Sequence, residues 1–197
     1  MSDEVLIIDT GQSLPKPKTL EPLPLYDENY YMLNQVMPDY KDRLPNAYMD
    51  NLVTRMRKTM KKFSGIGLSA NQCGVQARVF LIGHEDFDIV CINPRVIGQS
   101  DKMIKTEEGC LSFPGLFCKI ERPDWIDVEF TNEKGETLQT RLEGLTARCF
   151  LHELDHMNGI KFTKHIGAVS LKMAREKQNK RIKLMKRRMK NNELLVR

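Results

Sequence analysis

The clearest hydrophobic pattern in the chain lies between residues 47 and 63, where apolar residues recur at helical spacing. The lysine and arginine residues of this segment fall off the apolar face, as expected for a helix that packs against a core on one side only. The apolar stripe consists of Met49, Leu52, Val53, Met56, Met60 and Phe63. We interpret this methionine-rich stripe as core packing rather than as a ligand site.

Strand patterns dominate the middle of the chain. The predicted strands span residues 78–83, 89–97, 126–130 and 138–142. Asn93 and Pro94 interrupt the second strand, and a turn at residues 132–135 joins the last two into a β-hairpin. Gly144 ends this hairpin, and the next helix begins near Leu145. Short strands around a few helices predict an α+β fold, with antiparallel sheets packed around a central helix.

The two ends of the chain differ from this middle part. Six prolines interrupt residues 11–46, which favours an extended N-terminal wrap with one short helix at residues 27–37. We therefore expect a catalytic domain over residues 1–170, with residues 1–46 as its wrap. Residues 171–197 are expected to form a basic C-terminal tail. This tail belongs to a helix that begins near Val169.

Composition places the chain among ordinary globular proteins. It has 197 residues, of which 41% are hydrophobic and 29% charged. No apolar run reaches the roughly 18 residues of a membrane span, and the acidic start differs from a secretory signal. The five cysteines form no C-x-x-C pair, which favours free thiols in a reducing cytoplasm. The net charge of +5 comes from residues 172–190, which contain ten Lys or Arg residues and one acid.

Residues 150–159 contain the candidate chemistry, because they include the pattern H-E-x-x-H. On a helix, His152 and His156 project from one face and can bind one metal ion. Glu153 follows the first histidine directly, so its carboxylate can reach water polarised by that ion. Two histidines do not complete such a site, and a third ligand must come from elsewhere.

The extended zinc-protease motif H-E-x-x-H-x-x-G-x-x-H does not supply the third ligand. Its last histidine would fall at residue 162, which is Phe162. His165 lies too far along the chain, and His84 is expected in a solvated turn. Cys110 lies between Gly109 and a Pro-Gly turn, so a Cys-His-His site with an open fourth position is plausible. Such a thiolate-containing ligand set suits iron, zinc or cobalt.

Three alternatives remain open at this point. A metallopeptidase of the H-E-x-x-H kind would cleave peptide bonds. A cysteine hydrolase would use Cys110 with His152 and leave His156 without a role. A nucleic-acid-binding protein would use the metal structurally and the basic tail for contact with RNA.

Three short motifs make the chain similar to the peptide deformylase family. The first family motif has the form G-φ-G-φ-A-A-x-Q, and residues 65–72 read G-I-G-L-S-A-N-Q. The second, E-G-C-L-S, is residues 108–112 without change, and the third, H-E-x-D-H, is residues 152–156. All three occur in the family's order, and the resemblance covers about residues 47–165. It implies hydrolysis of the N-formyl group from N-formylmethionyl peptides.

The resemblance also implies roles for individual residues. The implied metal ligands are Cys110, His152 and His156. Glu153 corresponds to the general acid/base, while the Gln72 amide and the Leu111 backbone N–H correspond to donors for the formyl oxygen. The ion in this family is normally Fe(II), with zinc, nickel or cobalt as substitutes. The expected substrate-binding residues are Gly65, Ile66, Gly67, Gly109, Leu145, Arg148 and Cys149.

Some positions differ from the family pattern. Ser69 replaces an alanine and Asn71 a variable residue, and with the N-terminal segment they resemble phage-encoded members. Leu151 is often glutamine in the family. Arg148 lies where several members have an aliphatic pocket residue, so a less apolar pocket is expected.

The basic tail has two interpretations. It is a solvated helical extension, or it binds ribosomal RNA near the exit tunnel, as some deformylases do with a C-terminal helix. The expected partners are therefore formylmethionyl peptides and the ribosome. We expect a monomer in the cytoplasm of a bacterium or a phage-infected host, with no membrane contact.

Overall fold

The computed structural model describes residues 20–84 and 87–195. The helical elements are the 3-10 helix η1 (Tyr31–Asn34), α1 (Ala47–Lys62), the 3-10 helix η2 (Ala70–Cys73), α2 (Gly144–Met157), the 3-10 helix η3 (Phe162–His165) and α3 (Ala168–Leu195). The strands are β1 (Gly67–Ser69), β2 (Val79–His84), β3 (Phe87–Gln99), β4 (Met103–Gly109), β5 (Phe117–Pro123), β6 (Trp125–Thr131) and β7 (Thr137–Glu143).

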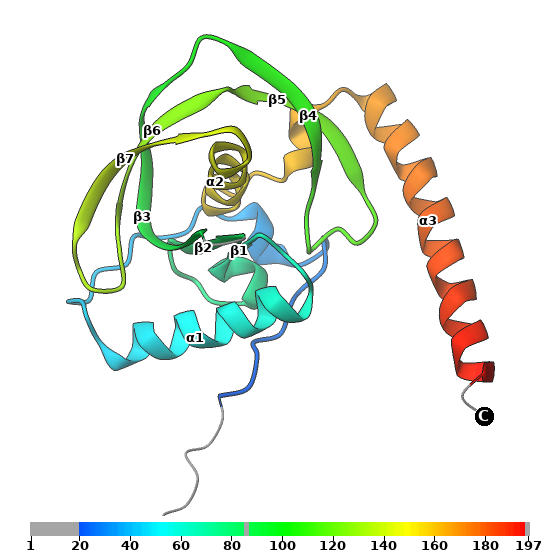
Figure 1. The fold of residues 1–197 in the computed structure, drawn as a ribbon, viewed down its shortest axis with the longest axis horizontal. Coiled ribbons are helices and arrows are strands. Elements are labelled where there is room, and N and C mark those ends of the chain that lie inside the picture. The colour runs from blue at the N-terminus through cyan, green and yellow to red at the C-terminus, as the bar shows by residue number, and fades with distance from the viewer. Residues whose placement is uncertain (1–19, 85–86, 196–197) are drawn as a thin grey trace, which may run out of the picture.

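Antiparallel strands surround α2, which lies in the middle of the molecule (Figure 1). Five strands form one sheet in the order β1-β2-β3-β6-β7, and β4 pairs with β5 in a separate two-stranded sheet. Every pairing is antiparallel. The predicted α+β class, the hairpin of β6 and β7, the central helix and the C-terminal helix are confirmed.

Strand β2 is buried on both faces because α1 covers one face and α2 the other. Val79 and Leu81 belong to the apolar cluster beneath α1, whereas Phe80 and Ile82 belong to the cluster around α2. Phe80 meets Phe150 of α2 edge to face, with ring centres 5.0 Å apart. This double burial explains the continuous apolar run at residues 79–82, where a half-exposed strand would alternate.

Helix α1 confirms the first predicted element. Asn46 caps it, because the Asn46 side chain accepts a hydrogen bond from the Met49 N–H at 2.9 Å. The predicted stripe is buried from Met49 to Met60. Phe63 was wrongly included in this stripe: it follows the last helical residue and is 45% exposed.

Strand β3 bends at the position where the sequence predicted an interruption. Asn93 has a φ of 53°, and the pairing with β6 shifts register between Ile92 and Arg95. The Asn93 side chain exchanges two hydrogen bonds with the Tyr40 backbone, at 2.8 and 2.9 Å. The bend therefore fastens the N-terminal segment to the sheet. The turn expected around residues 85–86 lies outside the described residues.

The β4–β5 hairpin was not predicted. Glu108 is the only fully buried residue of β4, so the strand lacks an alternating apolar pattern. Strand β4 nevertheless places Glu108 at the metal centre and ends at Gly109, just before Cys110.

The described part of the N-terminal segment contacts the body through backbone hydrogen bonds. The helix predicted at residues 27–37 is only the single 3-10 turn η1. The Tyr26 N–H donates to the Gln72 carbonyl at 2.9 Å, and the Met37 N–H donates to the Met157 carbonyl at 2.8 Å. These bonds join the segment to η2 and to the end of α2. The first 19 residues lie outside the description.

Helix α3 begins where the sequence placed the last helix and runs along one side of the molecule (Figure 1). Its first half contacts the body through Gln178, which is buried, and through Arg175, which forms an ion pair with Glu28. The division of the chain near residue 170 stays a prediction. None of the helices in residues 20–84 and 87–195 combines the length and apolar character needed to cross a membrane.

Candidate metal centre

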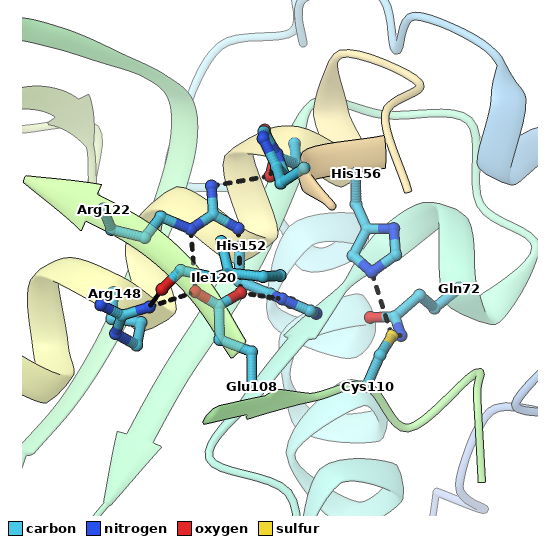
Figure 2. A network of polar contacts seen from close by, with 10 residues as sticks. Gln72, Glu108, Cys110, Ile120, Arg122, Arg148, His152 and His156 are labelled. Carbon is cyan, nitrogen blue, oxygen red and sulfur yellow. Dashed lines mark hydrogen bonds and ion pairs between the residues drawn. The ribbon is translucent and has the colours of Figure 1, made fainter. Parts of the chain in front are cut away.

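Two segments distant in sequence, the residue after β4 and helix α2, bring Cys110, His152 and His156 together. One potential ligand atom from each of these residues lies within 4.8 Å of the other two. The Cys110 Sγ is 3.3 Å from His156 Nε2, and Figure 2 shows these two atoms facing each other. The two histidines are one turn apart on α2, with ring centres 5.2 Å apart. The structure thus gathers the three predicted ligands at one point.

A buried network of charged residues orients the first histidine. Glu108 Oε2 is 3.1 Å from His152 Nδ1, which leaves His152 Nε2 for a metal. Arg122 donates to both Glu108 oxygens at 2.9 Å and to Asp155 Oδ2 at 2.8 Å. Arg148 donates to Glu108 Oε1 at 2.7 Å. This network joins β4, β5 and α2 (Figure 2).

His165 also belongs to this network. Its Nε2 is 2.7 Å from Asp155 Oδ2, on the side of Asp155 that Arg122 also contacts. His165 is not part of the three-residue cluster, in line with the sequence-based expectation. The side chain of His84 lies outside the described residues.

The network fixes the charges around the cluster. Burial alone raises the pKa of the Glu108 carboxyl, but hydrogen bonds from Arg122 and His152 outweigh it and lower the pKa to about 2. Burial lowers the pKa of His156 well below its usual value, so its imidazole is neutral. Burial also opposes a charge on His152, but hydrogen bonds with Cys110 and Glu108 raise its pKa well above the usual value. A metal must therefore displace a proton from His152.

Glu153 is a buried carboxyl next to the cluster. Burial raises its pKa to about 7, while His152 and the Ser69 hydroxyl act in the opposite direction. A group with a pKa near the working pH can both accept and donate a proton. Glu153 Oε2 is buried and has no hydrogen-bond partner in the structure. This unpaired oxygen is available to a water or a substrate atom.

The Gln72 carboxamide has a fixed orientation. Its Oε1 accepts from the Ser69 N–H at 3.0 Å and from the Ser69 hydroxyl at 2.9 Å. Its Nε2 therefore points the other way, to the Ser112 hydroxyl at 3.0 Å and the Cys110 Sγ at 3.4 Å. The predicted oxyanion donor thus lies beside a predicted ligand. Ser69, which differs from the family's alanine, adds one of the two bonds that orient it.

Two glycines of the first motif allow the three motifs to meet. A Cβ atom on Gly65 would lie 2.6 Å from Leu111 Cδ1. A Cβ atom on Gly67 would lie 2.5 Å from Glu153 Oε1 and 2.6 Å from the Cys149 Sγ. A side chain at either position would displace Leu111 or Glu153. Gly109 is covered in a similar way by the Phe117 ring.

The predicted substrate-binding residues separate into two groups. Leu145 and Arg148 border a pocket of about 260 Å³. Cys149 instead lies beneath the first motif, where its thiol is 3.5 Å from the Ile66 carbonyl oxygen. The pocket is further lined by Ile104, Thr106, Pro123, Asp124 and Gly144. Sequence reasoning missed Ile104 and Thr106 because it did not predict the β4–β5 hairpin.

Arg148 does not leave a free charge in the pocket. Its guanidinium donates to Glu108, to the Ile120 carbonyl at 3.0 Å and to the Ile104 carbonyl at 2.6 Å. The side chain is buried, and these three acceptors bind both of its terminal nitrogens.

These residues fit a divalent metal ion. A thiol and two imidazoles converge, and one imidazole is held by a buried carboxylate, as is usual for metal-binding histidines. The unpaired Glu153 oxygen beside them fits a catalytic centre with an open position rather than a closed structural site.

A family model described as polypeptide deformylase matches residues 23–172. The chain belongs to the peptide deformylase family. This family assignment accounts for the three motifs and for the Cys-His-His cluster, because the family depends on a metal. The chain is a metal-dependent hydrolase acting on the N-formyl amide bond, and the metallopeptidase alternative is not favoured.

Curated relatives and solved structures agree with the family. A peptide deformylase of Aquifex aeolicus is 42% identical over 155 residues, which cover 76% of this chain and 91% of the relative. One of Agrobacterium fabrum is 34% identical over 170 residues, covering 84% and 95%. A Synechococcus elongatus deformylase solved in complex with actinonin has a TM-score of 0.76 at 30% identity, covering 90% of this chain and 95% of that one. An Acinetobacter baumannii deformylase solved with Met-Ala-Ser has a TM-score of 0.73 at 28% identity, covering 75% and 100%.

Proposed function

We propose that this chain removes the formyl group from N-formylmethionyl nascent peptides, with Cys110, His152 and His156 holding the metal. The observation that carries the proposal is the convergence of these three ligands beside the unpaired carboxyl of Glu153. The proposed native ion is Fe(II), with zinc, nickel or cobalt as substitutes. When bound, such an ion would supply Lewis-acid chemistry that polarises the formyl group and acidifies water.

In this proposal, Glu153 moves the protons. Its carboxylate takes a proton from the attacking water and then passes a proton to the amine that leaves. Its pKa of about 7, raised by burial, supports both steps near neutral pH. Formate and a free amino terminus are the products.

Gln72 and Leu111 are the proposed donors to the formyl oxygen. The Gln72 Nε2 lies near the Cys110 Sγ, and the backbone N–H of Leu111 follows Cys110 directly in the chain. Since Ser69 already holds the Gln72 oxygen, the amide needs little reorganisation when charge develops on the substrate. Gly65, Gly67 and Gly109 are proposed to let the peptide backbone approach closely.

The methionine side chain is proposed to enter the 260 Å³ pocket, which Leu145 and Arg148 border. Leu145 is 55% exposed and offers an apolar surface at the entrance. Ile66 is also half exposed, and it is proposed to contact the substrate from the opposite side with Cys149 beneath it.

An anaerobic assay with formyl-Met-Ala-Ser tests this function. We expect formate release at about one metal per chain, and loss of both metal and activity in Cys110→Ser, since a serine hydroxyl is a poor substitute for a thiolate ligand. Cys118→Ser, a buried cysteine of β5, serves as the control and is expected to keep its metal.

Other outcomes would support the alternatives. Cleavage of internal peptide bonds without formate would indicate a metallopeptidase. Full activity of Cys110→Ser with one metal per chain would exclude Cys110 as a ligand. Formate release that persists after the metal is removed, but is lost in Cys110→Ser, would indicate a cysteine hydrolase.

We also propose that α3 binds ribosomal RNA. Lys172, Lys180, Lys183, Lys186 and Arg187 are exposed along this helix. Such a row of cations attracts phosphates without sequence preference, and the attraction weakens as salt rises.

Co-sedimentation with ribosomes measures this interaction. We expect binding at 50 mM salt to fall by at least tenfold at 200 mM. Neutralising Lys183, Lys186 and Arg187 together is expected to weaken binding several-fold, whereas neutralising Lys58, Lys61 and Lys62 on α1 leaves it unchanged. Equal effects of the two triple variants would contradict a specific role for α3. A cytoplasmic monomer remains the proposed form.

A further inference from the structure

The turn at residues 113–117 connects the metal centre to α3. The Phe113 N–H donates to the Cys110 carbonyl at 2.9 Å, and the Leu116 N–H donates to the Phe113 carbonyl at 3.1 Å. Ser112, just before the turn, accepts a hydrogen bond from Gln72. The position of this turn therefore affects both Cys110 and the partner of Gln72.

Two residues of α3 bind successive carbonyls of this turn. Gln178 is only 4% exposed, although it lies on a helix rich in charged residues. Its Nε2 donates to the Pro114 carbonyl at 3.0 Å, and Arg181 donates to the Gly115 carbonyl at 3.3 Å. The Arg181 guanidinium also stacks on Phe117, 4.8 Å from the ring centre. The buried amide of Gln178 is thus the centre of the contact between α3 and the turn.

Arg175 extends the contact to the N-terminal segment. It donates to the Gln178 Oε1 at 2.9 Å and forms a bidentate ion pair with Glu28. Glu28 lies two residues after Tyr26, whose N–H binds the Gln72 carbonyl. Helix α3 therefore contacts both the turn at residues 113–117 and the N-terminal segment. Each of these contains or adjoins a residue that hydrogen-bonds to Gln72, the proposed oxyanion donor.

Aromatic packing relates the same turn to the second ligand. The Phe113 ring meets Phe162 edge to face, with centres 5.2 Å apart, and Phe162 lies 5.5 Å from the His152 ring. Phe113 and Phe162 are both fully buried. A shift of the turn would consequently disturb His152 as well as Cys110, because close-packed side chains transmit displacement.

We propose that Gln178 is a positioning residue for the metal centre, acting through the turn at residues 113–117. The first half of α3 is then part of the catalytic unit, and only its second half is an appended basic tail. This inference rests on the proposed role of Cys110 as a ligand. Loss of the Gln178 amide removes the hydrogen bond that holds the Pro114 carbonyl against α3, so the turn loosens and the thiolate is held less firmly.

Full-length Gln178→Met tests the proposal, because methionine has a similar shape but cannot form either hydrogen bond. In zinc-loaded protein we expect roughly tenfold faster zinc release to a chelator, as for other supporting residues of metal sites. We also expect faster amide hydrogen exchange in residues 110–117, and a lower kcat with little change in KM. Asn179→Met, at the exposed neighbouring position, is the matched control and is expected to behave as the unaltered protein.

Gln178→Glu is the second variant. It keeps an acceptor for Arg175 but replaces the donor to Pro114 with an oxygen, so it is expected to release zinc as fast as Gln178→Met. If Gln178→Met does not fold, Gln178→Glu is compared with the Asn179→Met control instead. Zinc release and hydrogen exchange equal to those of the Asn179→Met control, in a folded Gln178 variant, would overturn the proposal.

The two proposals fail in different ways. A protein that binds zinc through Cys110 but releases no formate would sink the proposed function, while faster zinc release from Gln178→Met would still support this inference. If the unaltered protein releases formate and Gln178→Met has no effect, the proposed function stands and the inference about Gln178 fails. Retention of zinc in Cys110→Ser would overturn the inference, because Cys110 would then not be a ligand.

Discussion

Glu153→Gln is expected to reduce kcat for formate release by about 10²–10⁴-fold while the protein keeps its metal. Glutamine has nearly the same shape as glutamate, so it fits against Gly67, but it cannot accept a proton from water. Glu153 is almost fully buried, and glutamine fills the same space. The substitution therefore leaves no cavity and buries a neutral amide in place of the carboxyl. The measurement is steady-state formate release together with metal content and Tm.

The matched control is Glu143→Gln, an exposed residue directly before α2, which is expected to retain full activity. If Glu153→Gln keeps its metal and its kcat remains within tenfold of the unaltered protein, Glu153 is not the proton carrier. If the metal is lost as well, the activity measurement no longer isolates proton transfer, and the role of Glu153 would then be structural.

Glu108→Gln is expected to produce the largest loss of stability. The substitution removes the charge that faces Arg122 and Arg148, and both guanidinium groups are buried. Breaking a buried ion pair in this way costs about 3–5 kcal/mol in the free energy of unfolding. Since Glu108 also orients His152, we expect metal affinity to fall by about 10–100-fold. Urea denaturation and zinc titration measure the two effects.

Glu107→Gln is the control for this experiment. Glu107 precedes Glu108 in β4 but is exposed on the opposite face, so its replacement is expected to change the free energy of unfolding by less than about 0.5 kcal/mol. A Glu108→Gln protein as stable as this control would show that Asp155 and the backbone carbonyls suffice for the two arginines. Unchanged zinc affinity would show that His152 needs no carboxylate partner.

For Arg148, the sequence pattern predicts where the residue lies but not which groups bind its guanidinium. Its place on the metal helix predicts a substrate-binding residue, and in the structure Arg148 borders the pocket that is proposed for the methionine side chain. The pattern suggested that its charge makes the pocket less apolar. In the structure, Glu108 and two backbone carbonyls bind the guanidinium, and all three lie on or beside β4 and β5. No local signal in the sequence joins Arg148 to groups 28 to 44 residues away.

The sequence by itself determined the elements with a strong period and the residues that can bind a metal. The α1 stripe and the β6 alternation are visible because one face of each element is buried, which imposes a regular spacing on the chain. The spacing of His152 and His156 is likewise a local property of a helix.

Only the tertiary structure decided how these residues are supported. In β4 only Glu108 is buried, so no hydrophobic period marks the first strand of the β4–β5 hairpin. The Glu108–Arg122–Asp155 network and the contact of Gln178 with Pro114 join residues that are far apart in sequence. Such contacts depend on charge and hydrogen-bond partners that meet only after folding. For this reason the candidate ligands of the metal centre could be proposed from the sequence, whereas the residues that support those side chains could not.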